Sequence, residues 1–320
     1  MSITLENVLA LEALEARLRT ILPELYRDSY EEVVPVSMGS AGLKYGPDGR
    51  VAWNEMWATF CDLAMAGGPP HRGTLLQPGT REAIAANAEA HHRVLDEIHR
   101  GISLVSKLQL IPISQSREID PSWPCWIGVR CHSTGMAAWL VRAIVMENVL
   151  AKHDGESLYL PAGPDYRLAK EIKNVITVFA KTCHYWTSHM SPDQQEAIDT
   201  LLTNDAEGSE LLDFPSADLL ENDPAGYGQV ARELTAEITR RTGRACFANR
   251  YPGWIGVDCP NIRTAVWLMR AMTVENVLAR REDTVLFLPA NPRFVKENRV
   301  ARLVDAFERI HRLHAVKKFE

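Results

Sequence analysis

Thiols recur at one position of an internal repeat and could serve as nucleophiles. Cys131 and Cys259 each end a Trp-Ile-Gly-Val-x-Cys segment, and His132 directly follows the first of them. A cysteine beside an imidazole base is the arrangement of an activated thiol nucleophile. Cys131, Cys259 and His132 are therefore the candidate catalytic residues, with His184 as an alternative base. The competing interpretation is that both cysteines are small buried apolar side chains, as free cysteines often are.

Polar side chains also occupy the positions just before these cysteines. Arg130 and Asp258 stand there in two copies of the repeat, and a more diverged upstream copy places Lys44 and Tyr45 at the equivalent point. The copies of a duplicated fold keep their apolar residues because these pack the core. Polar residues that differ between the copies at one loop position therefore indicate a candidate binding site. The cations predict contact with a small anionic ligand or cofactor. The structural alternative for Lys44 and Arg130 is a plain surface charge.

Histidine and cysteine side chains gather near the ends of two expected helices. Cys183 and His184 lie near one end, and His311 and His314, one helical turn apart, lie near the other. Sulfur and imidazole ligands of this kind suit a transition metal, which makes such a metal a candidate cofactor. Imidazoles near helix C-termini are also favoured by the helix dipole alone.

No assembled catalytic motif is present in the sequence. The glycine-rich segment Ala66–Arg72 ends in a cation, but it lacks the GxxxxGK[ST] pattern and leads into an expected strand, which favours a turn. GxSxG, HExxH and Rossmann patterns are missing as well. These observations favour a binding or carrier protein for a small anionic ligand, cofactor or metal centre where the repeats meet. A Cys/His enzyme in the same cleft and a protein-interaction scaffold are the alternatives, and whether the protein is an enzyme stays open.

The elements that would position these residues belong to the repeat itself. Pro124–Cys131 and Pro252–Cys259 match closely and lie 128 positions apart (252 minus 124). The same spacing relates Glu147–Ala151 to Glu275–Ala279 without a gap. Identity at this density indicates duplication of one structural unit.

Each copy follows the order strand, helix, strand, helix. Apolar segments such as Trp126–Val129 show no polar alternation, which predicts strands buried on both faces. Asn148 and Asn276 are expected at the end of the next helix, where asparagine tolerates the left-handed conformation. Matches at Gly42–Tyr45 and Leu75–Pro78 indicate the third copy. We therefore expect an α/β fold of three βαβα units packed as one pseudo-threefold body, at about residues 39–100, 124–190 and 252–314.

Further helices are expected outside the repeated units. Thr4–Leu22 is amphipathic and ends before Pro23, and Ser191–Gln194 carries the cap, proline and glutamine of a helix start. The expected segments are an N-terminal helix, a first repeat, a second repeat, a helical insert and a third repeat, at residues 1–35, 36–112, 113–190, 191–251 and 252–320.

Composition restricts the class of protein. The 320 residues are 46% apolar and 24% charged, with a formal net charge of −6, which is typical of a globular protein and argues against nucleic-acid or anionic-membrane binding by charge. The N-terminal helix lacks the basic region and cleavage site of a signal peptide, and no apolar run is long enough to span a bilayer. The six cysteines form no Cys-x-x-Cys pair, so reduced thiols in a cytoplasmic protein are expected. The expected partner is a small or anionic ligand, and the N-terminal helix is a candidate surface for a protein partner.

Overall fold

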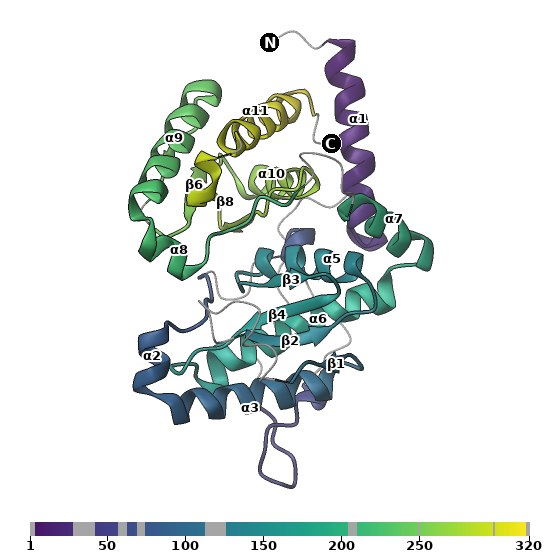
Figure 1. Ribbon diagram of the computed structural model, residues 1–320. Coiled ribbons are helices and arrows are strands. Elements are labelled where there is room, and N and C mark those ends of the chain that lie inside the picture. Colours follow the sequence, from purple (N-terminus) through teal and green to yellow (C-terminus); the bar gives the residue numbers. More distant parts are fainter. Residues whose placement is uncertain are drawn as a thin grey trace. The chain divides into compact units, whose positions relative to one another are not determined.

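Two compact units make up the chain in the computed structural model (Figure 1). The central unit comprises residues 33–64 and 68–199, and the C-terminal unit comprises residues 1–32, 65–67 and 200–320. Each unit has its own four-stranded sheet. The structure describes residues 4–27, 42–56, 63–68, 74–112, 126–203, 210–248, 250–296 and 298–317.

The central unit is built on an antiparallel sheet with the strand order β1-β2-β4-β3. Its two inner strands pair along their whole length, from Trp126 opposite Pro161 to Arg130 opposite Ser157. Residues 126–129 are buried, as the absence of polar alternation predicts. The strands of this sheet are β1 (Gln109–Leu110), β2 (Trp126–Arg130), β3 (Lys152–Asp154) and β4 (Ser157–Pro161).

Helix α6 of the central unit contacts both α3 and α5 (Figure 1). Helix α5 is capped by the Ser133 hydroxyl, which accepts a hydrogen bond from the Met136 backbone N–H. It is buried from Gly135 to Met146, in agreement with a sequence that is apolar there except for Arg142. A π-helical turn, η5 (Leu168–Ile172), leads into α6. The helices are α2 (Arg81–Ala86), α3 (Ala88–Val105), α5 (Thr134–Met146), α6 (Lys173–His189) and α7 (Pro192–Leu202), whose last residues belong to the C-terminal unit.

The sheet of the C-terminal unit has the corresponding strand order, β5-β6-β8-β7. Its inner strands pair from Trp254 opposite Pro289 to Asp258 opposite Val285, which is the register of the central sheet moved by 128 positions (254 minus 126). The strands are β5 (Cys246–Phe247), β6 (Trp254–Asp258), β7 (Arg280–Glu282) and β8 (Val285–Pro289).

Helix α11 contacts α9 and α10 in the C-terminal unit, as α6 contacts α3 and α5 in the central unit. Helix α1 is capped by Thr4 and ends before Pro23, as its sequence predicts, and it packs on α10 and α11. No helix in the described ranges has both the length and the apolar composition of a bilayer-spanning segment. The helices are α1 (Leu5–Ile21), α8 (Ala217–Asn222), α9 (Pro224–Thr242), α10 (Ile262–Val274) and α11 (Arg299–Val316).

Asparagine ends the equivalent helices α5 and α10. Asn148 and Asn276 have φ angles of 61° and 56°, which lie in the left-handed region. The expectation that asparagine stands there because it tolerates this conformation is confirmed.

The expected pseudo-threefold body is not confirmed. Among the described residues of the segment 39–100, Tyr45 pairs with Val51 in an isolated bridge, and a 3-10 turn, η3 (Trp53–Glu55), follows. Leu76 pairs with Val149 of the central unit, just as Leu212 pairs with Val277 in the C-terminal unit. The segment expected to form a strand of a separate first unit therefore lies beside the second one. The sequence matches that suggested a third copy are short, and this long-range pairing outweighs them.

Candidate functional site

Three of the predicted Cys and His residues line one pocket of the central unit. This α6 pocket has a volume of about 790 Å³ and lies between the end of α3, the loop after β2 and α6; it includes His132, Cys183 and His184. Burial, with a smaller contribution from the nearby Cys183 thiol, raises the pKa of Cys131 to about 12. A predicted catalytic residue, His132, and two predicted metal ligands, Cys183 and His184, thus line the same pocket.

The thiols of this region are not activated. Burial raises the pKa of Cys183 to about 12, and burial likewise raises that of Cys259, the predicted nucleophile of the C-terminal unit, to about 12. Because the thiolate is the nucleophilic form, thiols with such pKa values are protonated and unreactive near neutral pH. Cys131, Cys183 and Cys259 are buried and, like Cys246, not in a disulfide; Cys61 and Cys125 lie outside the described residues.

The residues predicted to bind a metal are divided between the two units. Cys183 and His184 belong to the central unit, and His311 and His314 to the C-terminal unit. Arg244 Nε donates a hydrogen bond of 3.1 Å to His311 Nε2, which occupies that nitrogen. Within the described residues, no group of three or more His, Cys, Asp or Glu side chains could hold a metal ion. A transition-metal site thus gains no support from this geometry.

The predicted ligand-binding residues are divided between the two units. Asp258 is in the C-terminal unit, whereas Lys44, Tyr45 and Arg130 are in the central unit. The Lys44 ammonium donates to the Glu55 carbonyl oxygen at 3.2 Å, and Arg130 ends β2. Tyr45 lines a different pocket from His132. The expectation that these loops gather beyond the carboxyl ends of strands presupposed parallel strands, whereas β2 and β4 are antiparallel and end at opposite edges.

Tyr45 lines a second pocket of the central unit. This α3 pocket has a volume of about 490 Å³ and lies between the segment 42–56, helix α3 and the residues that follow β4. Most of its walls are apolar or aromatic. Its described lining consists of Tyr45, Gly49, Arg50, Val51, Ala90, Arg93, Val94, Glu97, Pro164, Tyr166, Leu168 and Ile172.

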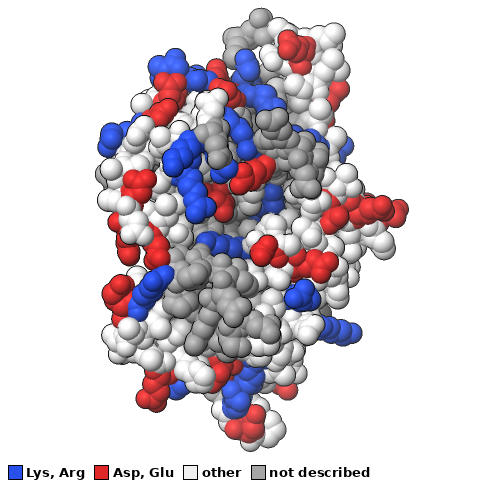
Figure 2. All heavy atoms as spheres, viewed as in Figure 1, with Lys and Arg blue, Asp and Glu red and all other residues white. Residues whose placement is uncertain are grey.

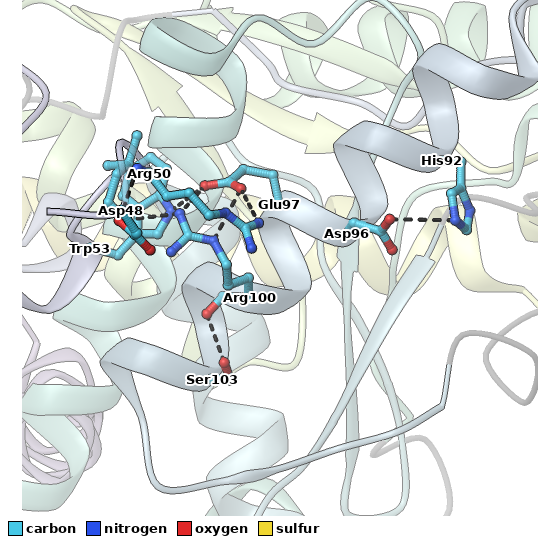
Figure 3. Close-up of polar contacts among 9 residues, drawn as sticks. Asp48, Arg50, Trp53, His92, Asp96, Glu97, Arg100 and Ser103 are labelled. Atoms are coloured by element: carbon cyan, nitrogen blue, oxygen red, sulfur yellow. Dashed lines mark hydrogen bonds and ion pairs between the residues drawn. The ribbon is translucent and has the colours of Figure 1, made fainter. Parts of the chain in front are cut away.

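Glu97 joins the two main walls of the α3 pocket (Figure 3). Its carboxylate accepts hydrogen bonds from Trp53 Nε1 at 2.7 Å, from Arg50 Nη2 at 3.1 Å and from Arg100 Nη2 at 2.5 Å. Arg100 Nη2 also donates to the Val51 carbonyl oxygen at 2.9 Å. One residue of α3 thus holds the buried Trp53 and the charged Arg50 in place, and Arg100 fixes the backbone between them.

The ionisation of Glu97 follows from these contacts. Burial by itself raises the pKa of the carboxyl group, but hydrogen bonds from Arg100, Trp53 and Arg50 outweigh burial and leave the pKa below its ordinary value of 4.5. Glu97 is therefore a carboxylate at neutral pH, with its oxygens already engaged. It fits a structural anchor better than a general acid.

Two tyrosines and a second arginine complete the α3 pocket. Tyr45 is 59% exposed, whereas Tyr166 is buried and donates its hydroxyl to the Gln77 carbonyl oxygen at 2.5 Å. Arg93 pairs with Glu89 at 2.6 Å on the outer surface of α3, with both side chains mostly exposed. Arg50, Arg93, Glu97 and Tyr166 were not among the predicted site residues. Two sequence signals could have identified some of them: the Pro47-Asp48-Gly49 turn before Arg50, and the charged residues of α3 at helical spacing.

Comparisons with known proteins give no relative from which a function could be transferred. No protein-family model matches the chain, and neither a curated protein nor a solved structure matches it.

Proposed function

We propose that the protein binds a small anionic molecule with a flat apolar body in the α3 pocket. The pocket volume of about 490 Å³ is in the range of small-molecule sites, which are mostly apolar with a few well-placed polar groups. Its lining follows this pattern. The observation that carries the proposal is that two arginines border an apolar pocket whose one lining carboxylate, Glu97, is already bound by three side chains.

The two halves of such a ligand would meet different side chains. Val94, Leu168 and Ile172 offer an apolar wall, and Tyr45 and Tyr166 offer aromatic rings against which a flat group can pack. Burial of the ligand body in this wall would provide most of the affinity.

The anionic end would be bound by the guanidinium groups. Arg50 donates to Glu97 through Nη2 and has further N–H groups, since a guanidinium carries five. The Arg93–Glu89 pair is exposed, and exposed ion pairs contribute little to stability, so a ligand anion can replace Glu89 at small cost.

Binding is preferred over catalysis for a chemical reason. The described lining of the α3 pocket contains no cysteine, serine or histidine. The Cys/His enzyme would have to use the α6 pocket, where the thiols are protonated near neutral pH because burial raises the pKa of Cys131 and Cys183 to about 12.

A dye pair tests the proposal. The anionic dye 8-anilinonaphthalene-1-sulfonate has fused flat rings and a sulfonate, and N-phenyl-1-naphthylamine has the same rings without the charge. Arg93→Ala should weaken binding of the sulfonate by about tenfold or more, the range for a lost hydrogen bond to a charged group, with little effect on the uncharged dye. Fluorescence titration measures both affinities.

Two further variants serve as controls. Glu89→Ala removes the surface partner of Arg93 but leaves the cation, so sulfonate binding should be unchanged or tighter. Ala90→Phe fills the pocket and should weaken both dyes. If Arg93→Ala and Ala90→Phe bind the sulfonate as well as the unmodified protein does, the α3 pocket is not the site.

A further inference from the structure

A second pocket, in the C-terminal unit, is rich in arginine. This α11 pocket has a volume of about 690 Å³, and its described lining includes Arg17 from α1 and Arg302, Arg309 and Arg312 from α11. Three carboxylates line it as well, those of Glu275, Asp305 and Glu308. Cationic and anionic side chains are interleaved over the described surface shown in Figure 2, so selectivity for an anion has to come from how individual groups are paired.

The carboxylates of the α11 pocket are already engaged. Glu275 accepts hydrogen bonds from Arg17 Nη1 at 2.8 Å and from Arg309 Nη2 at 2.5 Å. Asp305 and Glu308 both accept from Nη1 of Arg241, a residue of α9, at 2.6 and 3.0 Å. The acidic groups therefore have cationic partners of their own.

The arginines keep donors for a ligand. Arg312 is exposed and makes no ion pair or hydrogen bond with the described residues. Arg302 uses one nitrogen, Nη2, to donate to the Glu210 carbonyl oxygen at 2.5 Å, and Arg309 uses one nitrogen for Glu275. Since a guanidinium carries five N–H groups, Arg302, Arg309 and Arg312 together have many donors left.

The spacing of these arginines indicates an elongated ligand. Residues 302, 309 and 312 lie on one face of α11, because helical neighbours recur every three or four residues. With a rise of 1.5 Å per residue, Arg302 and Arg309 are about 10 Å apart along the axis, and Arg309 and Arg312 about 4.5 Å. Arg309 and Arg312 can share one anionic group, while Arg302 reaches another further along.

The start of α11 adds to the attraction for anions. Asn298, the residue before α11, also lines the pocket, and its side chain does not cap the helix. A helix N-terminus carries partial positive charge and favours phosphate groups. Arg302 lies in the first turns of the same helix, so the two effects act on the same end of the pocket.

Two of the three arginine positions do not hold lysine or arginine in the equivalent helix of the central unit. The positions 128 residues earlier, on α6 of the central unit, hold Asn174, Lys181 and His184. Asn174 is buried, and the buried Lys181 is paired with Glu147 at 2.8 Å. The same helix face thus has a packing role in one unit and carries a row of arginines in the other.

We infer that the α11 pocket binds a chain of phosphate groups, either free inorganic polyphosphate or the triphosphate of a nucleotide. A planar guanidinium binds phosphate oxygens through two parallel hydrogen bonds, and an extended phosphate chain can follow the row from Arg302 to Arg312. A single phosphate cannot contact both ends of the row and should bind more weakly.

Isothermal titration calorimetry with inorganic tripolyphosphate, ATP and orthophosphate at constant ionic strength tests this inference. Tripolyphosphate should bind more tightly than orthophosphate, and Arg312→Ala and Arg302→Ala should each weaken it by about tenfold or more. The matched control is Arg240→Ala, an exposed arginine of the same unit outside the pocket, which should bind as the unmodified protein does. Equal affinity for ATP would identify a nucleotide triphosphate as the ligand, and much weaker binding of ATP would identify free polyphosphate.

Either of two outcomes would overturn the inference. If Arg240→Ala weakens tripolyphosphate binding as much as Arg312→Ala does, or if neither Arg302→Ala nor Arg312→Ala changes it, the attraction is diffuse and no site exists. Arg312→Gln, which keeps a long polar side chain, confirms any loss in a variant that keeps the packing of the helix. Arg93→Ala in the α3 pocket should leave tripolyphosphate binding unchanged, so the two proposed sites can fail independently.

Discussion

Glu97 is the residue on which the shape of the α3 pocket depends. It receives hydrogen bonds from Trp53 and Arg50, which lie 44 and 47 positions away in the chain. A partly buried carboxylate is costly unless it is well bonded, and these donors hold the pKa of Glu97 below 4.5 although burial acts to raise it. The charge of Glu97 therefore fastens the segment 42–56 to α3.

Protonation of Glu97 should weaken the central unit. Because the pKa of Glu97 is lower in the folded than in the unfolded chain, its contribution to stability is full above pH 4.5 and declines as the pH falls below that value. Glu97→Gln should lower the free energy of unfolding by about 1.5 kcal/mol at pH 7, and this difference should stay constant down to pH 4.5 and shrink as the pH falls further. Urea unfolding of both proteins across this range measures it. A difference that stays constant with pH would mean that the charge of Glu97 is not what matters.

The ends of the equivalent helices α5 and α10 can be compared directly between the two units. Glu147 follows α5 and pairs with Lys181 of α6 at 2.8 Å, with 0% and 6% of the two side chains exposed, and it also accepts a hydrogen bond of 2.7 Å from the Ala64 backbone N–H. Glu275 follows α10 and pairs with Arg309 of α11 at 2.5 Å, but 48% of the Arg309 side chain is exposed. The same pairing is therefore buried in one unit and open to solvent in the other. This geometry favours a structural role for the two glutamates over acid–base chemistry.

Removal of the cation that pairs with Glu147 or with Glu275 should lower the free energy of unfolding by different amounts in the two units. Lys181→Met leaves the buried carboxylate of Glu147 without its charged partner and should cost about 3–5 kcal/mol of unfolding free energy. Arg309→Met, at the equivalent exposed position, should cost less than about 1 kcal/mol. Denaturant unfolding of the two single variants compares them. Glu147→Gln should recover part of the loss in the Lys181→Met background, and similar costs in both units would contradict the assigned role of burial.

Each compact unit of the whole molecule has its own core. Trp139 and Trp267 occupy equivalent positions on α5 and α10, and both are fully buried. Each unit also carries one added segment beside its proposed pocket: residues 42–56 against α3 in the central unit, and α1 against α10 and α11 in the C-terminal unit. The proposed sites thus lie where a segment is added to the shared arrangement of sheet and helices.

Two separate cores predict two thermal transitions. Trp139→Leu should lower the melting temperature of one calorimetric transition by roughly 6–12 °C and leave the other unchanged, because the cavity it creates lies in the core of the central unit. Trp267→Leu should do the converse. Differential scanning calorimetry resolves the transitions. A single transition that both variants shift equally would show that the chain unfolds as one cooperative body.

Local sequence patterns determined most of the elements of this protein. The buried strands at Trp126 and Trp254 and the left-handed Asn148 and Asn276 were predicted correctly. These features are determined by residues only a few positions apart: by runs of apolar residues, by capping side chains and by the conformational freedom of particular residue types. The sequence did not predict that His132, a candidate catalytic residue, would line the same pocket as Cys183 and His184, the candidate metal ligands.

Only the tertiary structure decided which distant segments meet and what that does to their side chains. The sequence Arg280-Arg281-Glu282 has the composition of an exposed turn, yet it forms the buried strand β7, where the Arg280 guanidinium lies 4.1 Å from the ring centroid of Phe287. The pairing of Leu76 with Val149 and the hydrogen bonds from Trp53 and Arg50 to Glu97 likewise join residues that are far apart in the chain. Such contacts depend on the packing of the whole unit. Packing also determines which side chains are buried. Because burial raises the pKa values of Cys131 and Cys259 to about 12, it argues against these two predicted nucleophiles.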